Sequence, residues 1–237
     1  MLNLGLAGPA GCGKDAVAEY LVERYGFISY SFTDALYREV AEAYSLEDES
    51  LLRDRATKEV PTDRLAMVRL SDALQFDLGH AIGWDMGSGF GAEPDLQAPL
   101  SPRQVLQWWG SEYRRAQAPN YWVHKADEWL EQIMHMGYPE HAPQMFVNTS
   151  VRFPNEQDWI KTGSPWNDSP AWKGNIWHIH RDGLDAVNAH QSETPLPVLP
   201  GERELWNNDT LARLYYGVDL LLTTATPFVK VEPMEKE

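Results

Sequence analysis

The feature that most constrains the fold of this chain is an apolar run followed by a glycine-rich loop and a helical pattern, all before residue 27. Residues 2–7, LNLGLA, are uncharged and mostly apolar, which is typical of a parallel strand buried on both faces. Residues 8–14, GPAGCGK, fit the pattern G-x-x-x-x-G-K. Apolar residues then recur at helical spacing up to Gly26, which suits a helix C-cap. With a second apolar run at 27–32, FISYSF, this order predicts a βαβ unit and hence a parallel sheet.

The glycine-rich loop has the residues of a phosphate-binding site. Glycines at positions 8, 11 and 13 let the backbone turn its N–H groups toward an anion, and the following helix adds the positive end of its dipole. Lys14 is placed to reach the β- and γ-phosphates of a nucleotide. Cys12, the single cysteine, is either a reactive thiol in this loop or buried beneath it. The residues that we expect around the phosphates are Gly8, Ala10, Gly11, Cys12, Gly13, Lys14, Asp15 and Ala16.

The residue after the lysine is Asp15, where this pattern usually has serine or threonine. The usual hydroxyl is a ligand of Mg²⁺. A carboxylate can replace it, directly or through water, because Mg²⁺ prefers hard oxygen ligands and keeps several waters. We therefore predict Asp15 as the metal-binding residue, with a helix-capping role as the alternative.

Composition narrows the partners that this chain can have. Its 237 residues suit one α/β domain with insertions or two small domains. No apolar run approaches 18 residues, the N-terminus has no basic leader and a lone cysteine forms no internal disulfide, so we expect a cytoplasmic protein without a membrane partner. The net charge of −15 and the lack of a basic run argue against a nucleic acid polymer. Thirteen of the 20 basic residues are arginine, whose planar fork grips phosphate, so small anionic molecules are the expected partners.

Further elements follow from periodicity, caps and turn residues. Helices are expected at 34–44, over much of 45–79, at 102–116 after an N-cap at Ser101, at 120–137, from 155 onward, and at 210–222 after an N-cap at Asp209. Strands are expected at 145–151 and 175–181. The intervening stretches 83–100 and 164–174 have the composition of loops.

Several segments occur in an order that resembles bacteriophage-type deoxynucleoside monophosphate kinases. They are GKD, SFTDALYREV, LQWWGSEYRRAQAPNYWV, VRFPNEQDWI, HIHRDG, HQSE and NNDTLARL, and the resemblance spans roughly residues 2–222. It implies an α/β, three-layer P-loop kinase fold in a single domain over 1–237, with a parallel sheet core flanked by helices. It also implies a helical acceptor-binding insertion at approximately 38–140 and a lid at 155–175 or 182–205. A homodimer is left open, and a viral protein would work in the host cytoplasm.

The resemblance further implies an activity and its residues. The γ-phosphoryl group of ATP would pass to a deoxynucleoside 5'-monophosphate with Mg²⁺, giving a diphosphate for DNA precursor synthesis. Lys14 would act with Arg152, which directly follows a predicted strand, and with Arg181, which ends another. The acceptor would be held by residues from the insertion, namely Asp34, Arg38, Arg114, Arg115 and Trp122. The alternatives are an N-cap for Asp34, a surface charge for Arg181 and a core position for Trp122.

Other functions stay open at this point. A family Asp before the V-R-F triplet is replaced by Ser150, which weakens the expected metal shell and favours an ATP-binding switch without efficient transfer. A kinase for another small acceptor, such as a coenzyme precursor or a modified nucleotide, would use the same phosphate loop. His178 and His180 alternate on one strand and could bind zinc, but no cysteine is near them and packing is the preferred interpretation.

Overall fold

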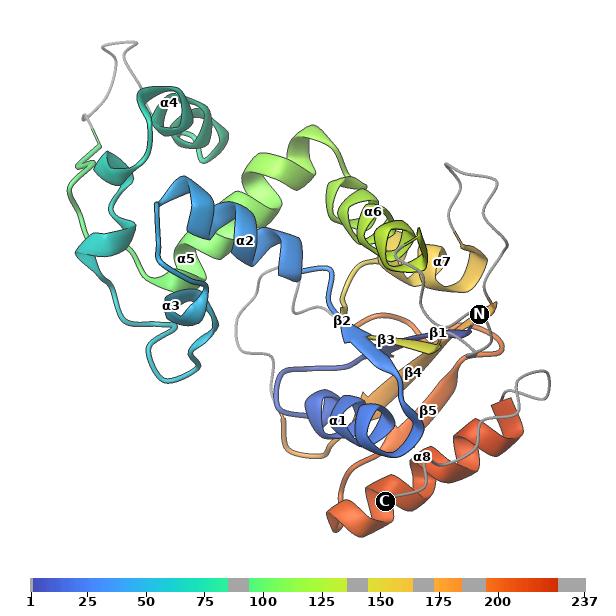
Figure 1. The fold of residues 1–237 in the computed structure, drawn as a ribbon. Helices are drawn as coiled ribbons and strands as arrows, with labels where there is room; N and C mark the ends of the chain where they lie inside the picture. The colour runs from blue at the N-terminus through green and yellow to red at the C-terminus, as the bar shows by residue number, and fades with distance from the viewer. Residues whose placement is uncertain (1, 85–93, 136–144, 164–172, 185–194, 226–237) are drawn as a thin grey trace. The chain divides into compact units, whose positions relative to one another are not determined.

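The computed structural model describes residues 2–84, 94–135, 145–163, 173–184 and 195–225, and at its centre lies a sheet with all strands parallel (Figure 1). This arrangement confirms the predicted α/β class. The strands lie in the order β2 (Ile28–Tyr30), β3 (Met145–Val151), β1 (Leu2–Ala7), β4 (Lys173–His180) and β5 (Arg203–Trp206).

Strand β1 occupies the middle of the sheet because every one of its residues is buried. It pairs with β3 on one side and β4 on the other, with Leu2 opposite Met145 and Lys173. An uncharged run such as LNLGLA can be covered on both faces, as parallel strands require. The loop that follows β1 therefore leaves from the centre of the sheet's carboxyl edge.

Helices cover both faces of the sheet (Figure 1). On one face, α1 (Lys14–Tyr25) and α8 (Leu211–Ala225) pack with Leu4 and Leu6 in a continuous apolar core. On the other face lies α7 (Pro154–Thr162), close to Gly5 of β1. A Cβ atom at Gly5 would lie 2.6 Å from Ile176 Cδ1, so glycine permits this close packing.

The carboxyl ends of the strands bring distant parts of the sequence to one edge of the sheet. The glycine-rich loop follows β1, Arg152 follows β3, Arg181 follows β4 and Asn207 follows β5. Ligands of open parallel sheets bind at this edge, where successive helices pass to opposite faces. The fold therefore places the predicted phosphate loop where a ligand is expected.

A second compact unit spans Thr33–Ala126, whereas Met1–Phe32 and Asp127–Glu237 form the unit with the sheet. The second unit contains α2 (Asp34–Ala43), α3 (Ser50–Arg53), α4 (Asp72–Ala81) and α5 (Pro102–Gln107). Helix α6 (Tyr121–His135) begins in this unit and continues into the first. The stretch expected to be an insertion, 38–140, overlaps this unit.

Some predicted elements differ from the structure. Residues 45–79 contain only α3, the 3-10 turns Asp63–Leu65 and Met67–Arg69, and the start of α4. Pro61 disfavours a continuous helix through this stretch, because it lacks the N–H that a helix interior needs. The helix expected over 102–116 becomes a π-helix at Trp108–Arg115. The last helix is capped by Thr210, whose hydroxyl accepts from Arg213 N, rather than by Asp209.

Strand boundaries also shifted. Strand β2 stops at Tyr30 because Phe32 N bonds the Ser150 hydroxyl instead of continuing the ladder. Strand β5 was not predicted, since its four residues include two charges. The strand at Met145–Val151 and the caps at Ser101 and Gly26 are confirmed. Residues 85–93 of the expected loop, and residues 164–172 and 185–194 of the two expected lid stretches, lie outside the described residues.

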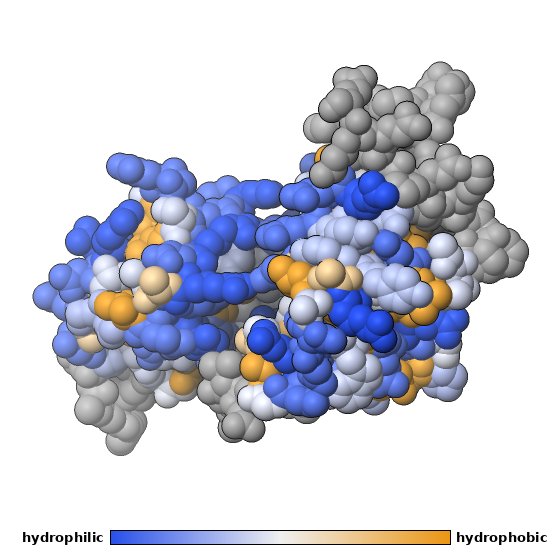
Figure 2. All heavy atoms as spheres, turned by 90° about the horizontal axis from the view of Figure 1, so that it is seen from below, coloured by the Kyte–Doolittle hydropathy of each residue, from blue (hydrophilic) through white to orange (hydrophobic). Residues whose placement is uncertain are grey.

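The surface view from below is mainly hydrophilic, and its apolar residues form small separate patches (Figure 2). Helix α8 exposes more than half of Leu211, Tyr216 and Leu220. Within the described ranges, no helix combines the length and the apolar character that crossing a membrane would need.

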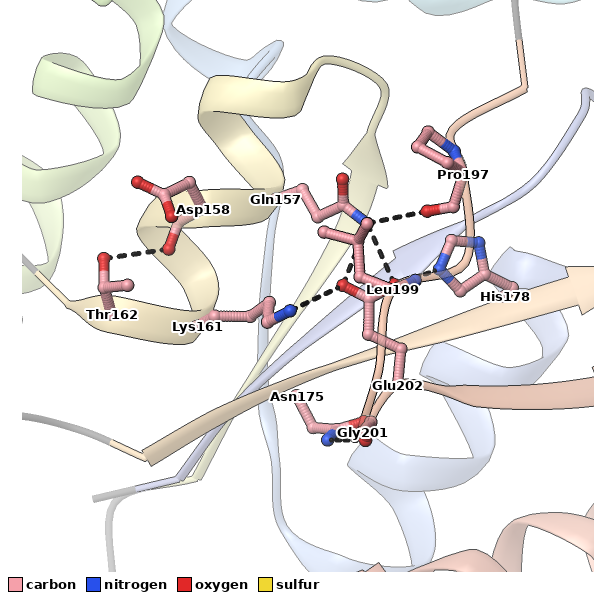
Figure 3. A network of polar contacts seen from close by, with 10 residues as sticks. All are labelled: Gln157, Asp158, Lys161, Thr162, Asn175, His178, Pro197, Leu199, Gly201 and Glu202. Carbon is pink, nitrogen blue, oxygen red and sulfur yellow. Dashed lines mark hydrogen bonds and ion pairs between the residues drawn. The ribbon is translucent and has the colours of Figure 1, made fainter.

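A buried carboxylate fixes the segment that leads into β5 (Figure 3). Glu202 has 1% of its side chain exposed and accepts hydrogen bonds from Leu199 N at 2.7 Å and from Gln157 Nε2 at 2.9 Å. His178 Nε2 lies 2.8 Å and Lys161 Nζ 3.2 Å from its two oxygens. A buried charge requires such partners, so this carboxylate ties β5 to α7 and β4.

The pKa of Glu202 follows from these contacts. Burial by itself raises the pKa, but the bonds from Leu199 N–H, His178 and Lys161 outweigh it and hold the pKa below its ordinary value. A carboxyl group with a lowered pKa in the folded state stabilises the protein above its unfolded-state pKa, and this contribution disappears as pH falls through the folded value.

We predict that Glu202→Gln lowers the free energy of unfolding at pH 7 by about 1.5–3 kcal/mol, because Gln turns an NH₂ donor toward groups that donate. Urea unfolding at a series of pH values measures this difference. The difference should persist down to roughly pH 5 and shrink as pH falls further, through the lowered pKa of the folded state, where the wild-type carboxylate protonates. Glu204→Gln is the matched control, since Glu204 is 49% exposed and pairs with His180; its effect should stay within about 0.5 kcal/mol. A difference for Glu202→Gln that does not change with pH would contradict the role of its charge.

Candidate functional site

The loop between β1 and α1 has the backbone shape that binds phosphate. Gly8, Gly11 and Gly13 have φ values of 140°, 78° and 112°, a region that L side chains rarely adopt. Gly13 is the N-cap of α1, which begins at Lys14. The loop N–H groups and the positive helix end thus belong to one short segment, as anion binding requires.

Lys14 lies over this loop. Its Nζ donates to Gly8 O at 2.7 Å and to Pro9 O at 2.8 Å, so the ammonium is folded back onto the loop carbonyls. The side chain of Cys12 is fully buried in the core with α1 and α8. The structure thus favours the buried alternative for the thiol. Ala10 lies exposed in the loop, while Ala16 packs against the core.

Asp15 is exposed in the first turn of α1 and lines a groove of about 360 Å³. Glu19 of the same helix, Ser29 of β2 and Thr149 of β3 line the same groove. A carboxylate and a hydroxyl beside a phosphate loop are hard oxygen donors of the kind that Mg²⁺ takes, together with phosphate oxygens and water. These residues therefore fit the expected metal, and Asp15 stays its predicted ligand.

Ser150 has a structural position at the end of β3. Its hydroxyl lies 2.6 Å from Ser31 Oγ and accepts from Phe32 N at 3.1 Å. It therefore fastens β3 to the chain that follows β2. The polar residue of β3 that lines the groove with Asp15 is its neighbour, Thr149.

The two predicted catalytic arginines both follow strands at the loop's edge of the sheet. Arg181 is exposed, and its Nη1 lies 3.4 Å from Gly11 O, so the structure brings it to the phosphate loop. Arg152 is half-buried at the start of α7. The Glu156 carboxylate accepts from the backbone N–H groups of Arg152 and Phe153, so it caps α7 and fixes the backbone of Arg152.

His178 and His180 each contact a carboxylate. His178 bonds Glu202, and His180 Nε2 lies 3.0 Å from Glu204 Oε2. In the part of the chain that the structure describes, no three or more His, Cys, Asp or Glu side chains are grouped to hold a metal ion.

The predicted acceptor residues belong to the second unit, and Asp34, Arg114, Arg115 and Trp122 have partners there. Asp34 Oδ1 lies 2.9 Å from Arg53 Nη2, and Arg53 also pairs with Glu49. The Arg53 guanidinium stacks over the Tyr37 ring at 4.3 Å. Arg38 is exposed on α2. Asp34 therefore pairs with Arg53 at the N-terminus of α2, where the helix dipole favours a negative charge.

Arg114 lies in the π-helix and forms an ion pair with Glu39. Tyr121 donates its hydroxyl to the same carboxylate at 3.0 Å. Burial by itself lowers the pKa of Arg114, but Glu39 outweighs it and holds the pKa above its ordinary value. Arg115 Nη1 donates to Pro119 O at 3.3 Å. The two adjacent arginines thus have different surroundings.

Trp122 has only 3% of its surface exposed and donates its indole N–H to Gly110 O at 2.9 Å. Trp109 is buried to a similar extent. The position of Trp122 agrees with the core alternative for this residue.

No protein-family model matches the chain. It is 30% identical over 224 residues to the protein named "Putative deoxynucleotide monophosphate kinase" of Acanthamoeba polyphaga mimivirus, and the match covers 91% of this chain and 93% of that protein. The chain belongs to the deoxynucleotide monophosphate kinase family. Membership confirms the resemblance seen in the sequence and makes this chain a phosphotransferase of the kinase type. A sugar kinase from a Janibacter species is similar in structure, with a TM-score of 0.41 and 12% identity over 94% of this chain and 93% of that one.

Sequence patterns missed some residues at the edge of the sheet in this kinase. Asn207 bonds the phosphate loop, and Asn208 bonds Asp182. Both lie in the segment NNDTLARL that carried part of the family resemblance, but nothing in that segment's composition says which residue contacts the loop. Their roles depend on contacts between residues more than 20 positions apart.

We predict that Gly8→Ala destabilises this kinase more than Gly83→Ala does. Both glycines have positive φ, but a Cβ at Gly8 would lie 2.4 Å from Ile179 O, whereas Gly83 has open space around it. Both substitutions strain a positive φ, which is 140° at Gly8 and 79° at Gly83, and the steric clash should add about 1–3 kcal/mol at Gly8. Urea unfolding of both variants measures the difference, and equal losses would mean that the loop can move away from Ile179.

Proposed function

We propose that this protein transfers the γ-phosphoryl group of ATP to a deoxynucleoside 5'-monophosphate. Family membership carries the kinase chemistry, and the shape of the phosphate loop supports a nucleoside triphosphate as donor. The observation that weighs most is the ammonium of Lys14, which lies 2.7 Å from Gly8 O, within a loop whose glycines have positive φ.

The donor phosphates would be held by the chain's own groups. Loop N–H groups and the N-terminus of α1 would bind the phosphate oxygens, and Lys14 would exchange its carbonyl partners for them. Arg181, next to Gly11, would neutralise charge on the transferred group. Arg152 is proposed for the same task from the end of β3.

Mg²⁺ would be held by Asp15, with Thr149 lining the same groove. When bound, this ion neutralises charge on the donor phosphates. The carboxylate of Asp15 sits close to the phosphate loop, where a cation would offset its charge.

The acceptor would be bound by the second unit. Arg38, Arg114 and Arg115 supply positive charge for its phosphate, and Asp34 supplies a hydrogen-bond acceptor for its sugar or base. Trp122 would contribute by supporting the π-helix through its bond to Gly110 O.

A panel of acceptors tests the proposed function. ADP formation from ATP and Mg²⁺ would be measured with each of the four deoxynucleoside monophosphates, with ribonucleoside monophosphates, and with no acceptor. We expect ADP formation that depends on at least one deoxynucleoside monophosphate. Activity with another acceptor alone would indicate a different kinase, and nucleotide binding without transfer to any acceptor would indicate a switch.

We predict that Lys14→Ala lowers kcat/KM at least about a hundredfold, or roughly 3 kcal/mol, because a positioned charge on the transferring group is lost. Steady-state kinetics with ATP measures the change in kcat/KM, and the free energy of unfolding should change little. Arg24→Ala is the matched control: Arg24 is exposed in the last turn of the same helix, so its removal should leave the rate within a few-fold. Activity of Lys14→Ala close to wild type would refute the assignment of the phosphate loop.

A further inference from the structure

The Asn207–Asn208 pair, which directly follows β5, contacts two other segments at the sheet's edge. Asn207 N donates to His180 O at 2.8 Å, which anchors the pair to the end of β4. The Asn207 side-chain amide donates to Cys12 O at 2.8 Å. Residue 207 therefore joins β4 to the phosphate loop.

The bond to Cys12 O sets the direction of a whole peptide group. A trans peptide is planar, and its C=O and N–H point in opposite directions. When Asn207 holds the Cys12 carbonyl, the N–H of Gly13 must point away from Asn207. That N–H belongs to the N-cap of α1, in the segment whose N–H groups we propose to bind phosphate.

Close packing reinforces this direction. A Cβ atom at Gly13 would lie 2.4 Å from Asn207 Nδ2 and 3.3 Å from its Cγ. The amide thus occupies the space that a side chain at position 13 would need. Glycine at this position serves the contact with Asn207 as well as the φ of 112°.

Asn208 holds the second segment. Its Oδ1 accepts from Asp182 N at 2.8 Å, and its Nδ2 donates to Asp182 Oδ2 at 2.7 Å. These two bonds fix the turn that carries Arg181, whose guanidinium lies 3.4 Å from Gly11 O. One dipeptide thus holds both the loop and the neighbouring arginine's turn.

We propose that Asn207 is a positioning residue for phosphoryl transfer, which orients the Cys12–Gly13 peptide so that its N–H faces the donor phosphates. This inference rests on the proposed function for its reaction, but it makes a separate claim about phosphate binding. Nothing in the segment NNDTLARL shows that Asn207 contacts the loop, because its partner lies 195 positions away.

The test is the affinity for ADP with Mg²⁺, measured by isothermal titration calorimetry on the full chain. Asn207→Ala removes the amide, and Asn207→Asp keeps its size but removes the donor. Both should weaken binding about tenfold, the effect of one lost and misdirected hydrogen-bonding group. The KM for the acceptor monophosphate should change less than twofold, since Asn207 contacts the phosphate loop, which is proposed to bind the donor.

Asn175→Ala is the matched control, because Asn175 Nδ2 donates to a backbone carbonyl too, that of Gly201 at 2.9 Å (Figure 3). Asn175→Ala should lower the melting temperature as much as Asn207→Ala does, and it should leave the affinity for ADP unchanged. An Asn207→Ala variant that binds ADP like wild type would overturn the proposal, as would an equal loss of ADP affinity in Asn175→Ala.

The outcomes separate this inference from the proposed function. A wild-type protein that binds ADP but phosphorylates no acceptor would refute the function, and weaker ADP binding by Asn207→Ala would still support the inference. An active wild type with unchanged ADP affinity in Asn207→Ala would refute the inference and leave the function standing.

Discussion

The central position of β1 is the constraint on which the site depends. Its residues are all buried, so the strand can lie only in the middle of the sheet, and its carboxyl end must open between β3 and β4. The glycine-rich loop therefore emerges between the segments that carry Arg152 and Arg181. A phosphate loop on an edge strand would have a neighbour on one side only. The central position of β1 thus puts an arginine-bearing segment on each side of the loop.

Polar contacts fix the direction of peptide groups, which packing of the apolar core does not set. Hydrophobic packing is non-directional, so it can hold β5 against the sheet without setting the direction of a peptide group. Hydrogen bonds are directional, and Glu202 and Asn207 supply them on either side of β5. Glu202 holds the chain entering the strand, and Asn207 links the chain leaving it to the phosphate loop.

Sequence patterns predicted the elements that are determined by residues close together in the chain. The strands at 2–7 and 145–151, the caps at Ser101 and Gly26, and the phosphate loop followed from burial pattern and turn chemistry. Strand β5 was missed because an edge strand of four residues with two charges has no pattern of its own and forms through pairing with β4. The π-helix at Trp108–Arg115 was missed because nothing in its residues departs from an ordinary helix.

The sequence by itself determined the phosphate loop with its flanking strand and helix, because these depend on residues close together in the chain. It also determined the family, because segments between residues 2 and 222 occur in the order typical of that family. Only the tertiary structure decided that Ser150 bonds Ser31 and Phe32 N, that Thr149 lines the groove with Asp15, and that Asn207 holds Cys12 O. Each of these contacts joins residues more than 100 positions apart. Such pairs meet only when the sheet has formed, because the order of parallel strands differs from their order in the chain.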